Sequence, residues 1–544
     1  MKKRLFLLLL SIYPIFTFAL PNADKGYYFY VQLKDKNNSP YSLDNPSLYL
    51  SQRAIDRRNY FSIPIDSLDL PVNPSYVSSI KNLGIYVHCK SKWLNGVTVL
   101  VKDSSVISSV RALSFVEKAE FTGITTENQA SYVAPRQKVV SVDYGESGSQ
   151  IKQMNGQYLH DAGFLGEDIQ IAVIDAGFND VDVNPGFAYL RNSGRLLGTK
   201  DFVNPFSNIY NEHSHGASVL TTMAGKADNN DYLGSAPEAS YWLLRSEAGD
   251  NEYLCETDFW MSAIEYADSV GADVATTSLG YYEFDDATMN FTHADLDGKT
   301  VRASISANIA TQKGMMLLNA AGNEGTKSWK KIGIPSDAEG VITVGAVKAD
   351  STMASFSSYG YSADGRVKPE LCARGQGTIL LNNAGMVSSG NGTSFATPLL
   401  AGLTACYLQA AKSKGIQFTL EDLRDNMYRS AHLYPNPTTH TGYGIPNFQT
   451  ALVMLDNMST RLAKSNQTIK ISLTQKSGIL SVITNLNLST NKTISIYDVT
   501  GHKVLTKKSK RRTTKFDISS LASGVYVIYI STSNNQTKTK LFVK

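Results

Sequence analysis

Cysteine is scarce in this chain of 544 residues, which contains only four: Cys89, Cys255, Cys372 and Cys406. Four cysteines permit three complete pairings, and the sequence does not decide between disulfide bridges and buried free thiols. Their spacing is unlike that of a zinc site. A His-Glu-x-x-His sequence is absent as well, which argues against a zinc metallopeptidase.

The chain also lacks a large charge excess and, after its first residues, any long apolar run. A net charge of +4 is small for this length and gives no reason to expect a nucleic-acid partner. Beyond residue 20 no stretch approaches the ~20 apolar residues of a membrane span. The start differs, because Lys2, Lys3 and Arg4 precede an apolar run from Leu5 to Phe16. We interpret residues 1–19 as a signal peptide rather than a membrane anchor.

Length and pattern divide the remaining chain into three domains, in line with roughly 150 residues per domain. Residues 20–125 mix strand-like runs such as Tyr27–Val31 with helical spacing such as Pro74–Leu83, which predicts a small α+β domain. Residues 126–148 are polar and aperiodic, and we expect a linker there.

The largest segment, residues 149–458, alternates strand runs such as Ile169–Ile174 with helical patterns such as Phe259–Val270. This alternation predicts an α/β fold with a parallel sheet and helices on both faces. A second polar linker follows at 459–468. Residues 469–544 then carry strand runs separated by turns and no helix, which predicts a small β-sandwich.

Three short segments of the α/β region carry groups for nucleophilic catalysis. Asp175 ends an apolar run and should lie at the carboxyl edge of a buried strand, where ligands bind in such sheets. His215 precedes glycine and small residues, as at a helix start. Ser394 lies in a glycine-rich turn just before a helical run, Leu399–Ala411. Each alone would more often be a cap or a polar loop residue.

Together these residues supply the nucleophile, the base and the orienting acid of one catalytic mechanism. A serine hydroxyl requires a base, histidine serves as one near pH 7, and a carboxylate orients the imidazole. Asn323 follows a buried strand between glycines, so its amide can project as a donor to a developing oxyanion. His213 is a rival base, but only His215 is followed by the Gly-x-x-Val pattern.

Asp175, His215, Asn323 and Ser394, in this order, resemble the subtilisin-like serine peptidases, the subtilases. The similarity covers roughly residues 150–455 and is most specific in the Gly-Thr-Ser-x-Ala-x-Pro motif at Ser394. The resemblance implies a subtilisin-like fold and a secreted serine endopeptidase that acts through an acyl-enzyme. The alternatives are an inactive surface adhesin on the same scaffold and an esterase, which would require a Gly-x-Ser-x-Gly elbow.

The resemblance also implies a substrate site and the absence of a required cofactor. Ser278, Leu279 and Gly280 would pair with substrate backbone, and Ala320, Ala321 and Gly322 would line the primary specificity pocket. Glu324 is either an acid at the rim of that pocket, favouring a basic substrate side chain, or a solvated charge.

Two departures from the family pattern bear on the site. Ala176 stands where many relatives have Ser or Thr, and residues 281–301 are expected to form a larger loop beside the cleft. No metal is expected among the catalytic groups, but the acids of Asp228–Asp231 and Asp295–Gly298 could form structural calcium sites or ordinary turns.

The flanking domains have resemblances of their own. Residues 20–125 are similar to an inhibitory propeptide that would cover the cleft until the linker is cut. Residues 469–544 resemble the sorting domain of the type IX secretion system, through Ile494–Gly501, Phe516–Leu521, Gly524–Tyr526 and Lys540–Lys544. The expected partners are protein or peptide substrates, the propeptide itself and the secretion machinery. Export through the periplasm to the cell surface or medium would follow, and the basic cluster Lys507–Lys515 is interpreted as a solvated hairpin.

Overall fold

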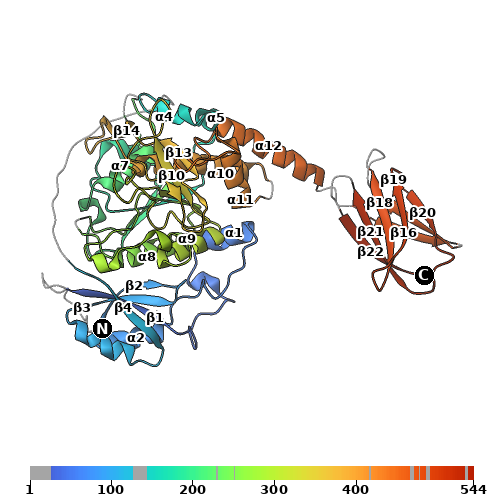
Figure 1. Cartoon of the computed structure of the whole chain (residues 1–544), viewed down its shortest axis with the longest axis horizontal. Coiled ribbons are helices and arrows are strands. Elements are labelled where there is room, and N and C mark those ends of the chain that lie inside the picture. The colour runs from blue at the N-terminus through green and yellow to red at the C-terminus, as the bar shows by residue number, and fades with distance from the viewer. Residues whose placement is uncertain are drawn as a thin grey trace, which may run out of the picture. The chain divides into compact units, whose positions relative to one another are not determined.

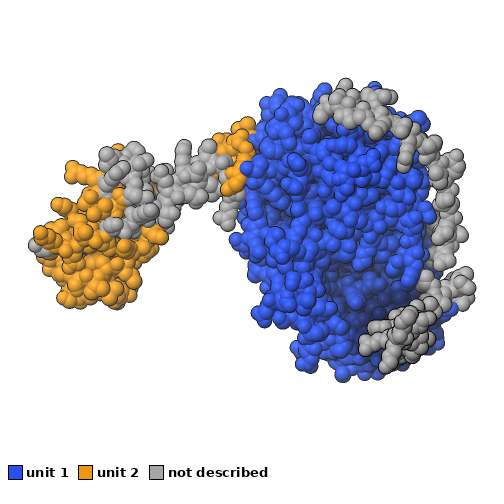
Figure 2. Space-filling model, turned by 180° about the vertical axis from the view of Figure 1, so that it is seen from behind, with its two compact units in different colours: residues 1–413, 418–452 blue, residues 414–417, 453–544 orange. Residues whose placement is uncertain are grey.

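Two compact units make up the computed structural model. The first holds residues 1–413 and 418–452, and the second holds residues 414–417 and 453–544 (Figure 2). The described residues are 26–125, 144–227, 231–249, 251–415, 418–465, 471–476, 478–484, 491–511, 513–532 and 537–544. The expected signal peptide and most of the first linker lie outside them.

The N-terminal domain is a four-stranded antiparallel sheet in the order β2-β3-β1-β4. Its elements are β1 (Tyr27–Leu33), α1 (Gln52–Tyr60), α2 (Pro74–Lys81), β2 (Tyr86–Ser91), β3 (Gly96–Val101), α3 (Ile107–Arg111) and β4 (Val116–Ile124). Phe29 and Val31 alternate with Tyr28 and Tyr30 along β1, so one face buries α2 and α3 and the other packs on the next domain. The small α+β domain is confirmed.

A seven-stranded parallel sheet forms the centre of the first unit, in the order β13-β10-β9-β8-β5-β7-β6 (Figure 1). Its strands are β5 (Gln170–Asp175), β6 (Leu196–Asp201), β7 (Ser240–Arg245), β8 (Val274–Thr277), β9 (Met316–Ala320), β10 (Ile342–Val347) and β13 (Leu371–Arg374). The short pairs are β11 (Gly360–Tyr361) with β12 (Val367–Lys368), and β14 (Thr378–Leu381) with β15 (Val387–Gly390).

Helices cover both faces of this sheet, as predicted. α7 and α10 pack together on one face, and α8 and α9 pack together on the other. The helices are α4 (Gly148–Gln153), α5 (Gln157–Asp161), α6 (Ala188–Asn192), α7 (His215–Ala224), α8 (Cys255–Val270), α9 (Arg302–Gln312), α10 (Thr393–Ser413), α11 (Leu420–Ser430) and α12 (Phe448–Ser465).

Two predicted boundaries are wrong. The helix of the serine segment begins at Thr393, so Ser394 lies inside its first turn rather than before it, with Pro398 within the helix. The second linker, expected at 459–468, is helical as far as Ser465. This segment includes Arg461, Leu462 and Lys464, which favour helix, and it contains no glycine or proline that would end one.

The second unit is a β-sandwich with its own core. One sheet is β16 (Ile471–Lys476), β17 (Ile479–Thr484) and β20 (Thr513–Asp517); the other is β19 (Lys503–Ser509), β18 (Lys492–Asp498), β21 (Val525–Thr532) and β22 (Thr537–Val543). Val482, Ile494, Phe516 and Ile528 are among the residues buried between them. The basic cluster is exposed but is not a hairpin, since β19 pairs with β18 and β20 pairs with β17.

All four cysteines are buried free thiols, which decides between the two alternatives left by the sequence. Within the part of the chain that the structure describes, no helix combines the length and apolar character needed to cross a bilayer.

Candidate active site

Four sequence-predicted residues lie where neighbouring strands end or where helices begin. Asp175 is the last residue of β5, and Asn323 follows β9 by three residues. His215 is the first residue of α7, and Ser394 is the second residue of α10. Because β5, β8 and β9 are neighbours in a parallel sheet, these groups meet at its carboxyl edge.

Asp175 and His215 form a hydrogen-bonded pair. His215 Nδ1 lies 2.7 Å from Asp175 Oδ1, which also accepts the Ala176 N–H at 2.8 Å. Oδ2 of Asp175 is buried without a hydrogen-bond partner among the described residues, so Ala176 contributes only its backbone. Burial would lower the pKa of His215, but the charge and hydrogen bond of Asp175 outweigh it and raise this pKa.

Glycine at position 216 allows this approach, because a Cβ there would lie 2.4 Å from the Gly177 oxygen and 2.8 Å from Asp175 Cβ. His213 is exposed, and its Nδ1 accepts the His215 N–H at 3.1 Å instead of facing the carboxylate. Of the two histidines, His215 is therefore the one held against an acid.

Ser394 is bound to the predicted substrate strand by two hydrogen bonds. Its Oγ donates to the Ser278 carbonyl at 3.3 Å, and Ser278 Oγ donates to the Ser394 carbonyl at 2.9 Å. The second bond depends on Pro398, since a residue at that position would normally donate its N–H to the carbonyl four residues earlier. Proline has no N–H, and the Ser394 carbonyl is left for Ser278.

The Asn323 carboxamide is oriented by Thr393. Its Oδ1 accepts the backbone N–H and the hydroxyl of Thr393, at 2.9 and 3.1 Å. A Cβ placed on Gly392 would lie 3.8 Å from Asn323 Nδ2 and 3.6 Å from the Ser394 nitrogen. Two N–H donors thus border the same glycine, and only a residue without a side chain leaves the space between them open.

A cavity of about 130 Å³ adjoins these donors. Its lining includes five of the six predicted substrate residues, together with Asn323 and Ser394: Ser278, Leu279, Gly280, Ala320 and Gly322. Ala321 does not line it; this residue is fully buried and its N–H donates to the Val344 carbonyl. Tyr282, Gly333 and Thr393 also line the cavity and were not predicted, since only the fold brings residue 333 beside Gly280.

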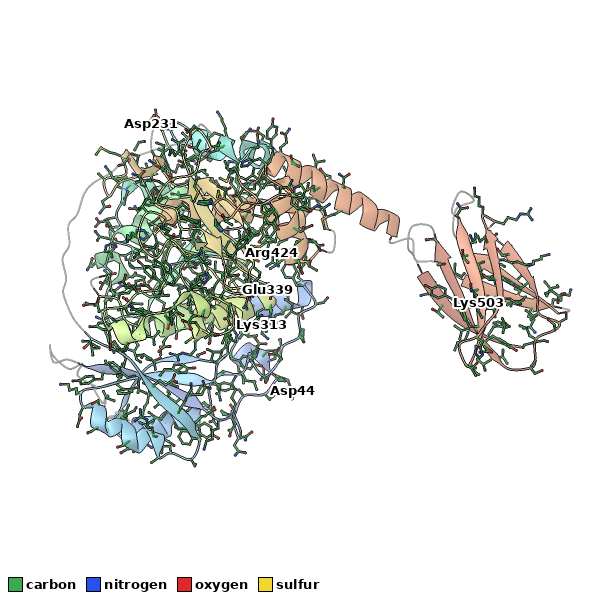
Figure 3. All side chains as sticks on the ribbon, in the orientation of Figure 1. Asp44, Asp231, Lys313, Glu339, Arg424 and Lys503 are labelled. Atoms are coloured by element: carbon green, nitrogen blue, oxygen red, sulfur yellow. The ribbon has the colours of Figure 1, made fainter. Side chains whose placement is uncertain are left out.

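Glu324 borders the same cavity with its charge already paired. Its carboxylate accepts the Tyr282 hydroxyl at 2.7 Å and lies 2.9 Å from Lys327 Nζ. It is neither a freely solvated charge nor an unpaired acid. A larger cavity, of about 330 Å³, lies between α9 and α11 beside Glu339 and Arg424 (Figure 3), and none of the predicted site residues lines it.

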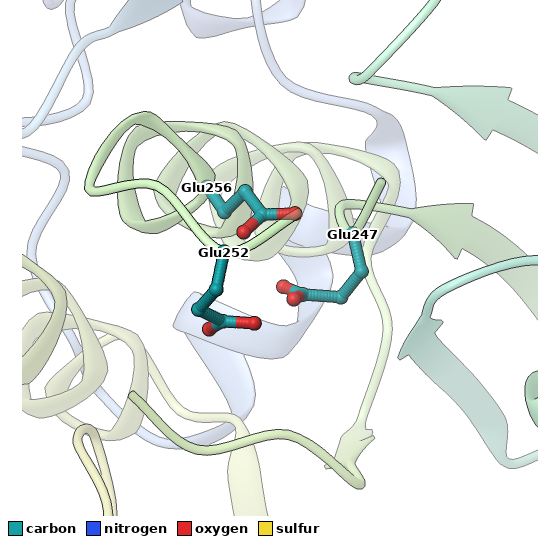
Figure 4. A group of neighbouring side chains, drawn as sticks. All are labelled: Glu247, Glu252 and Glu256. Atoms are coloured by element: carbon teal, nitrogen blue, oxygen red, sulfur yellow. The ribbon is translucent and has the colours of Figure 1, made fainter. Parts of the chain in front are cut away.

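A cluster of three glutamates was not predicted from the sequence. Carboxylate oxygens of Glu247, Glu252 and Glu256 lie within 4.8 Å of one another, and the side chains point together (Figure 4). Burial is the main cause that raises all three pKa values, that of Glu252 to about 7. Repulsion by Glu252 adds to the shifts of Glu247 and Glu256, and repulsion by Asp285 adds to that of Glu252. Such a set could share protons or hold a hard cation.

Two of the acids considered earlier for calcium accept hydrogen bonds from their own loop. Asp295 accepts the Thr292 N–H and hydroxyl, and Asp297 accepts the N–H groups of Lys299 and Thr300. Both close turns. Residues 228–230 lie outside the described residues.

The parallel sheet with helices on both faces and the groups at its carboxyl edge define a subtilisin-like serine peptidase, a hydrolase of peptide bonds. The model of the subtilase family matches residues 166–445, and the chain belongs to this family. Residues 28–138 match the Peptidase S8 propeptide domain of Bacteroidota. Residues 465–544 match the secretion system C-terminal sorting domain, which indicates export to the medium or the cell surface.

Similar proteins include several bacillary subtilisins. Subtilisin NAT of Bacillus subtilis subsp. natto is 30% identical over 319 residues, which cover 57% of this chain and 71% of the relative. Subtilisin of Bacillus pumilus is 30% identical, with 57% of this chain and 98% of the relative covered. Alkaline elastase YaB of Bacillus sp. (strain YaB) is 26% identical, with 55% and 69% covered.

Proposed function

We propose that this protein is a secreted serine endopeptidase whose nucleophile is Ser394, with His215 as general base, Asp175 as its orienting acid and Asn323 as oxyanion donor. The observation that carries the proposal is the arrangement of the Asp175–His215 pair, the Ser394 hydroxyl and the Asn323 amide around one carboxyl edge and its cavity. The subtilase assignment supports the same roles.

Proton transfer begins at Ser394. In the resting structure its Oγ faces the Ser278 carbonyl, so the hydroxyl rotates toward His215 Nε2 when substrate binds. Apo hydrogen bonds in such sites often tighten only in the complex. His215 removes the proton as Oγ attacks the scissile carbonyl, and Asp175 stabilises the imidazolium that forms. The same proton then passes to the leaving amine, and an acyl-enzyme remains for water to hydrolyse.

Charge on the carbonyl oxygen is received between Asn323 Nδ2 and the Ser394 N–H, which border Gly392. Loss of one such donor in subtilisin, a member of this family, costs about 3 kcal/mol of barrier. Ser278–Gly280 would bind the substrate backbone, and one side chain would enter the cavity. Substrate side chains that compete with Lys327 for Glu324 are at a disadvantage there. No cofactor is required for these steps.

The test is covalent labelling of the processed protein with a fluorophosphonate, which reacts only with an activated serine. We expect the unaltered enzyme to label and to degrade casein, Ser394→Ala to do neither, and Asn323→Ala to lose a hundredfold or more in turnover. His213→Ala is the matched control and should keep most activity. Equal labelling of Ser394→Ala would refute the nucleophile assignment, and a folded but unlabelled mature protein would indicate a binding role instead.

A further inference from the structure

The propeptide domain contacts the peptidase domain at two separate places. The first, which we call the platform, is the face of the β1–β4 sheet that covers α8 and α9. There the Arg302 guanidinium lies 4.1 Å from the centre of the Tyr30 ring, Thr98 bonds Asp258 at 3.2 Å and Ser91 bonds Glu265 at 2.6 Å. The second place is made by residues 46–72, which contain α1; we call this segment the clasp.

Two buried arginines attach the clasp to the end of α8. Arg58 is fully buried and donates to Asp69 within the clasp at 2.5 Å and to Asp268 of α8 at 2.9 Å. Arg57 donates to the Asp268 carboxylate and to the Ala272 carbonyl. Burial alone would raise the pKa of Asp268, but Lys92, Arg57 and Arg58 hold it well below its usual range.

The peptidase domain also contributes a basic residue, which forms ion pairs with acids of the clasp. Lys313, at the end of α9 (labelled in Figure 3), lies 2.8 Å from Asp69 and 2.9 Å from Asp66. Arginines of the clasp thus pair with an acid of the peptidase domain, and a lysine of the peptidase domain pairs with acids of the clasp. Each buried charge has a partner from the other domain. Removing one member, such as Arg58, leaves Asp268 and Asp69 buried with one opposite charge fewer each, which is costly.

The peptidase surface under α1 is shaped by two glycines. Gly271 ends α8 with a φ of +90°, and Gly314 follows α9 with a φ of +89°. A Cβ on Gly271 would lie 2.8 Å from the Ala54 nitrogen, and one on Gly314 would lie 2.9 Å from Ile63 Cδ1. Both turns thus leave room for the clasp where any other residue would collide with it.

Aromatic rings extend this contact to a third part of the peptidase domain. Tyr60 and Phe61 each pack edge-on against Phe418, with ring centres 5.7 Å apart. Phe418 precedes α11 and is 4% exposed.

The clasp lies at the sheet edge opposite the candidate active site. Arg53 donates to the carbonyls of Asp168 and Gly271 and to the Asp273 carboxylate, all just before the first residues of β5 and β8. Asp175 stands at the other end of β5. The clasp contacts therefore do not depend on the catalytic groups or on residues 126–143, where the two domains are joined.

From this geometry we infer that the amino-terminal edge of the peptidase sheet is a second propeptide-binding surface, which accepts a helix carrying an arginine pair. Cutting the connection at 126–143 then leaves the propeptide bound, and the clasp governs how slowly it departs. The inference concerns binding and holds whichever residues perform the chemistry.

The test uses the full chain with Ser394→Ala, to prevent self-digestion, and a recognition site for a sequence-specific protease within 126–143. After cutting, release of the propeptide is followed by size-exclusion chromatography over time. We expect the propeptide with an unmodified clasp to co-elute with the peptidase domain. The Arg58→Met substitution should speed release of the propeptide at least a hundredfold. Glu120→Gln, which alters a partly exposed ion pair with Arg302 on the platform, is the matched control and should change release less than threefold.

Two further variants decide the outcome if Arg58→Met does not fold. Tyr60→Ala alters only the rim of the clasp, and Phe418→Ala alters only the peptidase side; each should speed release several-fold. Release of the unmodified propeptide at once after cutting would overturn the inference. So would clasp variants that leave no faster than Glu120→Gln.

Discussion

At the scale of single residues, the three clustered glutamates all have pKa values raised above the ordinary range. Burial opposes the charged form of each, and Glu252 repels the carboxylates of Glu247 and Glu256 while Asp285 repels that of Glu252. The pKa of Glu252 rises to about 7, whereas an unfolded chain ionises glutamate near 4.3. Because the unfolded state loses its proton first, the contribution of Glu252 to stability declines as pH rises from about 4.3 to about 7 and is constant above that.

Glu252→Gln should therefore stabilise the protein at pH 8 and have little effect at pH 4.5. The amide removes a charge that the folded state resists, and it relieves Glu247 and Glu256 as well. Thermal unfolding of the Ser394→Ala chain at both pH values measures this, with exposed Glu339→Gln as the control. A lower melting temperature at pH 8 would mean that the cluster is held by a bound cation that needs all three charges.

The catalytic candidates were predictable from sequence and the glutamate cluster was not, for a physical reason. Asp175, His215 and Ser394 each sit in a local pattern of strand end, helix start or glycine turn that can be recognised along the chain. The glutamates acquire their character only from the folding of one loop over α8. The same holds for Gly333, which lies far from Gly280 in sequence.

At the scale of elements, α10 has a proline, Pro398, within the helix, where it cannot donate a backbone hydrogen bond. Proline inside a helix costs roughly 3 kcal/mol, and here it leaves the Ser394 carbonyl to the Ser278 hydroxyl. The proline therefore makes the helix less stable. It also lets Ser394 form a hydrogen bond with the segment that we propose binds the substrate backbone.

Pro398→Ala should raise the melting temperature and lower kcat/KM. The restored N–H competes for the Ser394 carbonyl and frees Ser278. Calorimetry and peptide hydrolysis of the processed enzyme measure the two effects. Ser278→Ala is the companion variant: it should lower kcat/KM similarly without the gain in stability. Unchanged kcat/KM in both variants would rule out a positioning role for this hydrogen bond.

Sequence patterns predicted most helices and strands but missed those that consist largely of polar residues. α12 continues through polar helix-forming residues that looked like a linker. β19 and β20 are rich in lysine, and only a few of their residues pack against the core, among them Val504, Leu505 and Phe516. α1 was not predicted at all, because the burial of Arg57 and Arg58 depends on acids more than two hundred residues away.

At the scale of the whole molecule, the two units have separate cores and are expected to unfold separately. A chain ending at Ser465 should lose one thermal transition while the other keeps its midpoint, because no buried cluster of the peptidase unit includes residues of the sandwich among those described. Differential scanning calorimetry tests this, and the shortened enzyme should hydrolyse peptides at the same rate. A midpoint lowered by many degrees would contradict the independence of the units.

One helix carries a consequence for how the peptidase domain comes to be folded. α8 contains Glu256, Asp258, Glu265 and Asp268 and no basic residue, and Asp268 lies in its last turn, where the helix dipole disfavours negative charge. The positive charges that pair with Asp268 are those of Arg57, Arg58 and Lys92 of the propeptide. Part of the information that specifies this helix is thus encoded in a segment destined for removal, and the mature enzyme, once unfolded, would have to rebuild α8 without it.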